Sequence, residues 1–224
     1  MDDQTRWTSV DQYFNTLLVP SDSALDAALR DSAKAGMPPH NVAPNQAKLL
    51  QLLIQIQGAK RILEIGTLGG YSTIWLARSI PADGRVISLE VDPERAELAR
   101  NSIRRAGLSD RVEIRTGRAV DTLPQLEAEG QGPFDFMFID ADKPSNPIYL
   151  AWALKLARRG TVIFADNVVR NGAVTDANSQ DANVQGVQRF SELVGNEPRL
   201  SATVLQTVGE KGYDGFMLAL VVSN

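Results

Sequence analysis

The sequence predicts an α/β fold in which a doubly wound, mostly parallel sheet follows an N-terminal helical cap. From residue 60 onward, short runs rich in Val, Ile and Leu alternate with segments of helical periodicity, the pattern of repeated strand–helix units. The last two strand-like runs are separated only by residues 209–214, too few for a parallel crossover. The last strand is therefore expected to run antiparallel. The first 57 residues, in contrast, show only helical candidates.

The expected elements follow this pattern in chain order. Asp92-Pro93 is a strong helix start, because Asp caps the first turn and Pro suits the first helical position. We predict one domain over residues 1–224, with the cap at 1–57 and the core at 58–224. Helices are expected near 9–19, 22–35, 45–57, 71–80, 93–106, 119–129, 147–158 and 181–195, and strands near 60–65, 85–90, 111–115, 134–139, 161–165, 200–207 and 215–222.

Composition excludes several classes of function. A chain of 224 residues with 43% hydrophobic content can bury the core of one globular domain. The net charge of -4 is spread without a basic block, so we expect no nucleic-acid or membrane partner. The chain has no cysteine, which excludes disulfides and thiol catalysis. No apolar run approaches the roughly 18 residues of a membrane span, so a cytoplasmic location is expected.

A glycine turn follows the first predicted strand. Gly66 and the Gly69-Gly70 pair allow backbone to approach a ligand closely, and the helix that follows offers free N–H groups to an anion. The spacing G-x-x-G-G differs from the dinucleotide fingerprint G-x-G-x-x-G, which disfavours a nicotinamide cofactor. The alternative is a turn that serves only tight strand-to-helix packing.

Glu90 ends the second predicted strand, about twenty residues after the glycines. An acidic side chain at this place can accept hydrogen bonds from both hydroxyls of a ribose, so we expect a cofactor that contains adenosine. The alternative is a solvated acid at a strand end.

Polar residues also follow two later strands. Asp140 comes directly after the strand near 134–139, and Asp166-Asn167 follows the strand near 161–165. Ligands in open α/β sheets bind beyond the carboxyl ends of strands, so these residues are expected in one cleft with Gly66 and Glu90. Two carboxylates and an amide oxygen form a hard ligand set suited to Mg²⁺. As an alternative, both aspartates cap helices.

Lys143 lies three residues beyond Asp140. A lysine in isolation is usually solvated, but a metal ion nearby disfavours its charged form. Lys143 is therefore a candidate general base.

Four segments together resemble the cation-dependent class I O-methyltransferases, the group of catechol and caffeoyl-coenzyme-A O-methyltransferases and their bacterial relatives. The likeness covers about residues 40 to 222, and its most specific segments are residues 63–72, 138–143, 165–168 and 211–215. It implies a Rossmann-like core, S-adenosylmethionine as cofactor, a divalent metal, a small phenolic substrate and a homodimer formed through the cap. Asn45 departs from the family pattern, which often has glycine at this position.

The resemblance also assigns roles by position. It implies that the metal is held by Asp140, Asp166 and Asn167, with Lys143 as the base. The residues that it implies for cofactor binding are Val42, Glu64, Gly66, Ser72, Glu90, Ala119 and Asp140.

The leading hypothesis is thus methyl transfer from S-adenosylmethionine to a hydroxyl of a catechol-like phenol, assisted by a divalent metal. Three alternatives remain: a metal-independent O- or N-methyltransferase, a nicotinamide oxidoreductase, and a non-catalytic protein that binds the cofactor. The loops expected to select the substrate are residues 37–44, 168–181 and 211–214.

Overall fold

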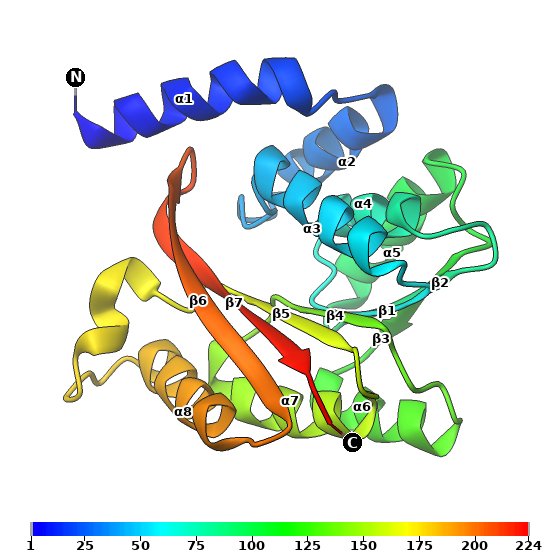
Figure 1. Ribbon diagram of the computed structural model, residues 1–224. Coiled ribbons are helices and arrows are strands. Elements are labelled where there is room, and N and C mark those ends of the chain that lie inside the picture. Colours follow the sequence, from blue (N-terminus) through cyan, green and yellow to red (C-terminus); the bar gives the residue numbers. More distant parts are fainter. Residues whose placement is uncertain (1, 224) are drawn as a thin grey trace. The chain divides into compact units, whose positions relative to one another are not determined.

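The computed structural model describes residues 2–223, shown in Figure 1. Within this range, seven strands are hydrogen-bonded in the order β3-β2-β1-β4-β5-β7-β6. The fold is therefore the predicted α/β sheet, mostly parallel, preceded by helices. Contacts divide the chain into two compact units, one reaching to Arg118 and including Gly209–Gly212, the other comprising Ala119–Val208 and the residues from Tyr213 onward. The single domain stays a prediction.

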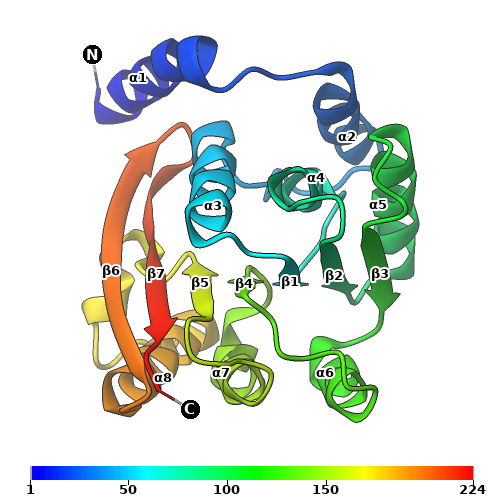
Figure 2. The same ribbon diagram turned by 45° about the vertical axis from the view of Figure 1, so that its right-hand side comes forward.

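The first unit contains three parallel strands and the N-terminal helical cap. β1 pairs with β2, and β2 pairs with β3, both in parallel register. Figure 2 shows α4 and α5 on one face of these strands. The elements are α1 (Asp3–Leu18), α2 (Ser23–Lys34), α3 (Pro44–Gln57), β1 (Arg61–Ile65), α4 (Tyr71–Ser79), β2 (Arg85–Glu90), α5 (Pro93–Arg105) and β3 (Val112–Thr116).

Asp92 begins α5 as predicted. Its Oδ1 accepts the backbone N–H groups of Glu94 at 2.8 Å and Arg95 at 3.2 Å, and Pro93 occupies the first helical position. This cap satisfies two N–H groups that a helix start leaves without partners. This cap therefore fixes the direction in which the chain leaves β2.

The second unit contains the remaining strands. β5 pairs with β4 in parallel and with β7 antiparallel, which confirms the predicted direction of the last strand. Figure 2 shows α7 and α8 on one face of this part of the sheet. The elements are α6 (Ala119–Ala128), β4 (Phe136–Ile139), the 3-10 helix η1 (Lys143–Ser145), α7 (Asn146–Lys155), β5 (Val162–Asp166), the 3-10 helix η2 (Arg170–Thr175), α8 (Ala182–Asn196), β6 (Leu200–Gly209) and β7 (Gly212–Val221).

Aromatic side chains link the three central strands of this unit. The rings of Phe138 and Phe164 meet edge to face with centroids 5.8 Å apart, and the rings of Phe164 and Phe216 stack at 4.4 Å. Such pairs add stability beyond the apolar area that they bury. β4, β5 and β7 are thereby held as a rigid support for the residues that follow β4 and β5.

Helix α1 begins earlier than predicted, at Asp3, because the side chain of Asp2 accepts the N–H of Thr5 at 2.8 Å and caps the first turn. A buried residue, Asp11, ties α1 to the rest of the unit. It accepts hydrogen bonds from the Asn45 side chain at 2.9 Å and from the backbone N–H of Glu210 at 2.8 Å.

Among the described residues, none of the helices combines the length and apolar character that a membrane crossing needs.

Two glycines of α8 allow a matched test of the packing. A Cβ at Gly186 would lie 2.2 Å from the carbonyl oxygen of Lys143, whereas a Cβ at Gly195 would meet nothing within 4 Å. We expect Gly195→Ala to stabilise the protein by about 0.5–1 kcal/mol, because alanine favours the helix. Gly186→Ala should instead destabilise it by about 1–3 kcal/mol, because the backbone of η1 cannot move away cheaply. Urea unfolding of both variants measures the difference, and equal shifts would contradict this packing.

Candidate active site

A carboxylate with no solvent exposure lies at the centre of the first unit. Glu64, in β1, accepts hydrogen bonds from the hydroxyls of Ser72 at 2.6 Å, Thr73 at 2.5 Å and Ser88 at 2.6 Å. Ser88 also shares a 2.5 Å hydrogen bond with Thr67. A buried charge is costly unless hydrogen bonds compensate for its lost hydration. The network therefore joins β1, β2 and the first turn of α4 at one point.

The network fixes a residue that the resemblance assigns to cofactor binding. Because the Ser72 hydroxyl donates its proton to Glu64, only its oxygen lone pairs stay available to a ligand. Glu64 thus orients the Ser72 hydroxyl at the start of α4. Tyr71, the first residue of α4, is a separate case: burial raises the pKa of its hydroxyl, so this hydroxyl stays neutral near neutral pH.

Glu90 is held at the end of β2 and is almost fully buried. Its Oε2 accepts the N–H of Leu68 at 2.8 Å, and its Oε1 accepts the N–H of Asp92 at 3.0 Å. These bonds hold the carboxylate in one orientation and tie it to the glycine turn. Each carboxylate oxygen keeps a further lone pair, so the group can still accept two donors from a ligand.

The packing of helices around the glycine turn explains in part why glycines stand there. A Cβ at Gly69 would lie 1.9 Å from the Oγ of Ser32 in α2. Gly70 has φ +87°, and a Cβ there would lie 3.3 Å from the Cα of Ala99 in α5. Tight packing against α2 and the left-handed backbone at Gly70 therefore favour glycine at these positions, whether or not a ligand approaches. Gly66, with φ 102°, directly follows β1 and is the glycine nearest to Glu64 in sequence.

Val42 and Ala119 occupy helix starts. Val42 is buried just before α3, and Ala119 is the half-buried first residue of α6. Asn45, the residue that departs from the family pattern, donates to Asp11 and accepts the N–H of Gln46 at 2.9 Å. Its side chain therefore connects α1 to the start of α3, which a glycine could not do.

In the second unit, the structure brings the predicted oxygen ligands to matched strand ends. β4 and β5 run parallel, and their last paired residues are Ile139 and Ala165. Asp140 and Asp166 come one position later on neighbouring strands, whose spacing is about 4.8 Å. Neither aspartate is a helix N-cap, since Asp142 precedes η1 and residue 169 precedes η2. The capping alternative is therefore wrong.

Lys143 lies beside the first of these carboxylates. Its Nζ is 3.2 Å from Oδ1 of Asp140, and its side chain is only 7% exposed. Asp166 is buried as well. Asp140 and Lys143 therefore interact in a site that is largely shielded from water, which strengthens electrostatic interactions there.

Asn167 supplies the third predicted ligand from a left-handed backbone conformation with φ 56°. Across residues 2–223, no group of three or more His, Cys, Asp or Glu side chains could hold a metal ion. A metal here would thus depend on the amide oxygen of Asn167 beside the two carboxylates. This donor set fits Mg²⁺, which usually binds one or two carboxylates and keeps several waters.

Sequence reasoning missed three parts of these sites. The hydroxyl partners of Glu64 were not predicted, although an acid within the apolar strand 61–65 was a usable signal. The left-handed conformations of Leu68 and Arg170 carry no clear sequence signal, whereas asparagine adopts this conformation more readily, so Asn167 and Asn171 carried a weak signal that was not used. The contacts of Asp214, described below, also join residues far apart in the chain.

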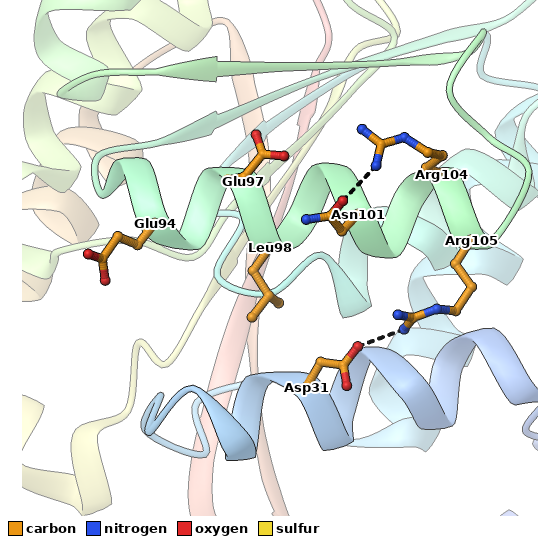
Figure 3. A pocket seen from close by; sticks show the side chains of 7 residues that line it. All are labelled: Asp31, Glu94, Glu97, Leu98, Asn101, Arg104 and Arg105. Atoms are coloured by element: carbon orange, nitrogen blue, oxygen red, sulfur yellow. Dashed lines mark hydrogen bonds and ion pairs between the residues drawn. The ribbon is translucent and has the colours of Figure 1, made fainter.

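A groove of about 760 Å³ lies between α2 and α5 in the first unit, and none of the predicted site residues lines it (Figure 3). Two interactions join residues that line it: Arg105 pairs with Asp31 at 2.8 Å, and Arg104 donates to Asn101 at 2.6 Å. We assign it no role in the chemistry.

The fold and the clusters at its strand ends define a class: an α/β protein with a buried acid on each of the first two strands and oxygen-bearing side chains at the ends of two later ones. Comparison with known proteins identifies the family. The O-methyltransferase family model matches residues 19–221. The chain is 56% identical over 213 residues to a catechol O-methyltransferase of Niastella koreensis, covering 95% of this chain and 96% of that protein.

Solved structures agree with this match. An O-methyltransferase from Bacillus cereus in complex with SAH is 60% identical with a TM-score of 0.96, covering 97% of this chain and 99% of that one. The O-methyltransferase TomG from Streptomyces achromogenes, in complex with SAM, is 51% identical with a TM-score of 0.97 over the whole of both chains. The chain therefore belongs to the S-adenosylmethionine-dependent O-methyltransferases of the catechol O-methyltransferase-like family.

Proposed function

We propose that this enzyme transfers the methyl group of S-adenosylmethionine to one hydroxyl of a small catechol-like phenol with the assistance of a divalent metal, Mg²⁺ being the favoured ion. Relatives at 51–56% identity are named catechol O-methyltransferases. The observation that carries the metal is the oxygen cluster at the ends of β4 and β5, where Asp140 and Asp166 occupy matching positions beside the buried Lys143.

We further propose that the first unit binds most of the cofactor. Glu90 would accept both ribose hydroxyls with the lone pairs that Leu68 and Asp92 leave free. The amino-acid part would lie against the glycine turn, where Gly66 lacks a side chain and the Ser72 oxygen is held by Glu64. The further proposed contacts are Val42, Ala119 and Asp140.

The reaction follows from the proposed positions of the chain's own groups. Asp140, Asp166 and Asn167 would hold the metal, which supplies a positive charge that makes a phenolic hydroxyl more acidic. Lys143 Nζ, as the neutral amine, would accept the proton of that hydroxyl, since it lies beside Asp140, one of the proposed metal ligands. The phenolate oxygen then bonds to the methyl carbon while the carbon–sulfur bond breaks and its electrons return to sulfur. S-adenosylhomocysteine and the methyl ether are the products.

Glu90 tests the cofactor site. Glu90→Ala should raise the dissociation constant of S-adenosylmethionine by about 100-fold or more, because two hydrogen bonds to a charged acceptor, each worth about 1.5–3 kcal/mol, would be lost. Titration calorimetry measures the change. Glu97→Ala is the matched control, since Glu97 is an exposed acid of α5 in an ion pair with Arg100. An unchanged affinity in Glu90→Ala would remove Glu90 from the site.

Asp166→Ala tests the metal. Turnover should collapse at low Mg²⁺ and recover partly as Mg²⁺ is raised, because mass action fills a weakened site. Cofactor affinity should be unchanged, since the first-unit residues are untouched. Turnover against Mg²⁺ concentration, with a catechol and labelled cofactor, measures the effect.

Lys143→Ala is the control for that titration. It should lower turnover about 100-fold, the usual scale for losing a general base, and added Mg²⁺ should not restore the rate. Full activity of the parent enzyme after exhaustive chelation would contradict the metal-assisted mechanism and favour a metal-independent methyltransferase.

We also propose a homodimer that uses α1. Five large side chains of this helix, Val10, Tyr13, Phe14, Leu17 and Leu18, are 49–63% exposed, and an apolar surface of this kind is typical of an interface. Sedimentation equilibrium should give twice the chain mass for the parent protein and a monomer for the double variant Phe14→Glu with Leu17→Glu. Leu193→Glu, which changes an exposed leucine of α8, should leave the mass unchanged. A monomeric parent would contradict the dimer.

A further inference from the structure

The segment that follows Asp166 has an unusual backbone. Four non-glycine residues have positive φ among those that the structure describes, and three of them, Asn167, Arg170 and Asn171, lie in this one segment. Left-handed residues persist only where surrounding contacts hold them, and they concentrate at functional sites. The contacts that hold this segment therefore bear on the proposed metal ligand Asn167.

One carboxylate supplies most of these contacts. Oδ1 of Asp214, in β7, accepts the backbone N–H groups of Val169 and Arg170, each at 2.9 Å. The same oxygen accepts the N–H of Gly215 at 2.9 Å, which fixes the carboxylate itself. Its Oδ2 lies 4.0 Å from the Arg170 guanidinium, at the limit of an ion pair. A charged acceptor that serves several N–H groups makes strong hydrogen bonds.

The neighbour of Asp214 completes the attachment. The carbonyl oxygen of Gly215 accepts the N–H of Val168 at 3.0 Å. A Cβ at Gly215 would lie 2.6 Å from the side chain of Val169 and 2.4 Å from the carbonyl oxygen of Leu205, so no larger residue fits. Three consecutive residues, 168–170, are thus bonded to Asp214-Gly215, directly beyond Asp166-Asn167.

We propose that Asp214 is a positioning residue for the methyl transfer. By fixing the backbone of residues 169 and 170, it sets the orientation of the Asn167 amide and the start of loop 168–181, which is expected to select the substrate. It thereby selects which of two adjacent phenolic oxygens is methylated. This inference rests on the proposed function, because it takes Asn167 as a metal ligand and a catechol-like phenol as substrate. Residues behind metal ligands commonly change metal affinity 10–100-fold when they are mutated.

A graded series of variants tests the proposal. Asp214→Asn keeps an oxygen that can accept the two N–H groups, Asp214→Ser keeps a single acceptor on a shorter side chain, and Asp214→Ala has none. We expect the affinity for Mn²⁺, measured by electron paramagnetic resonance on the protein without substrate, to fall less than about threefold for Asn and about 10-fold or more for Ala. The Ser variant should fall between them, and it replaces Ala in the comparison if Ala does not fold.

Two further measurements accompany the metal titration. The ratio of the two monomethyl products formed from a 4-substituted catechol should shift in the same order. The shift should be smallest in Asp214→Asn and largest in Asp214→Ala. The amide hydrogens of Val169 and Arg170 should exchange faster in Ser and Ala than in the parent. Asp22→Ala is the matched control, because Asp22 also accepts two backbone N–H groups, each at 3.0 Å, but caps α2. It should leave Mn²⁺ affinity and product ratio as in the parent.

The outcomes separate the two proposals. A parent protein that binds no Mn²⁺ would contradict the metal-assisted function and the inference with it. A parent that binds Mn²⁺, together with Ser and Ala variants that match it in affinity and product ratio, would overturn only the role of Asp214. The role is also overturned if Asp22→Ala shows the same changes, since general destabilisation would then explain them.

Discussion

The first unit depends on a carboxyl group that has no exposure to water and must find all its hydrogen bonds inside the protein. Glu64 achieves this through hydroxyls that belong to α4 and β2, so the strand register and the helix start must be correct together. Displacing any of these elements would leave a buried carboxyl group with too few donors, which is more costly than the loss of an ordinary contact. The glycine turn lies between the elements that Glu64 joins, and its geometry is fixed as a consequence.

Asp214 plays a comparable part in the second unit, with backbone N–H groups as donors in place of hydroxyls. Both carboxylates hold a segment in one conformation through hydrogen bonds, and both segments adjoin residues of the proposed sites. Preorganisation of this kind matters for methyl transfer, because the reacting oxygen, carbon and sulfur must lie in line. A small shift of the supporting backbone can therefore cost a large factor in rate.

The fold was predictable from the sequence because its signals are local. Apolar runs mark the strands. The pair Asp92-Pro93 marks the start of a helix, because the capping side chain and the first helical residue are neighbours in the sequence. The matched positions of Asp140 and Asp166 were also accessible, since adjacent parallel strands end at one edge of a sheet. The partners of Glu64 and Asp214 were not, because these contacts depend on strand register and join residues up to 45 positions apart. Helix α1 was predicted too short because its apolar residues are exposed, so the pattern of a buried face is weak.

Helix α1 and the β6–β7 hairpin are linked through one side chain. Asp11 accepts the N–H of Glu210 at the tip of the hairpin. A Cβ at Gly209 would lie 2.3 Å from Asp11, so the tip and the helix are shaped to each other. The hairpin tip is thus anchored by α1. A substitution in α1 at Asp11 would therefore alter the tip even though the tip's own residues stay the same.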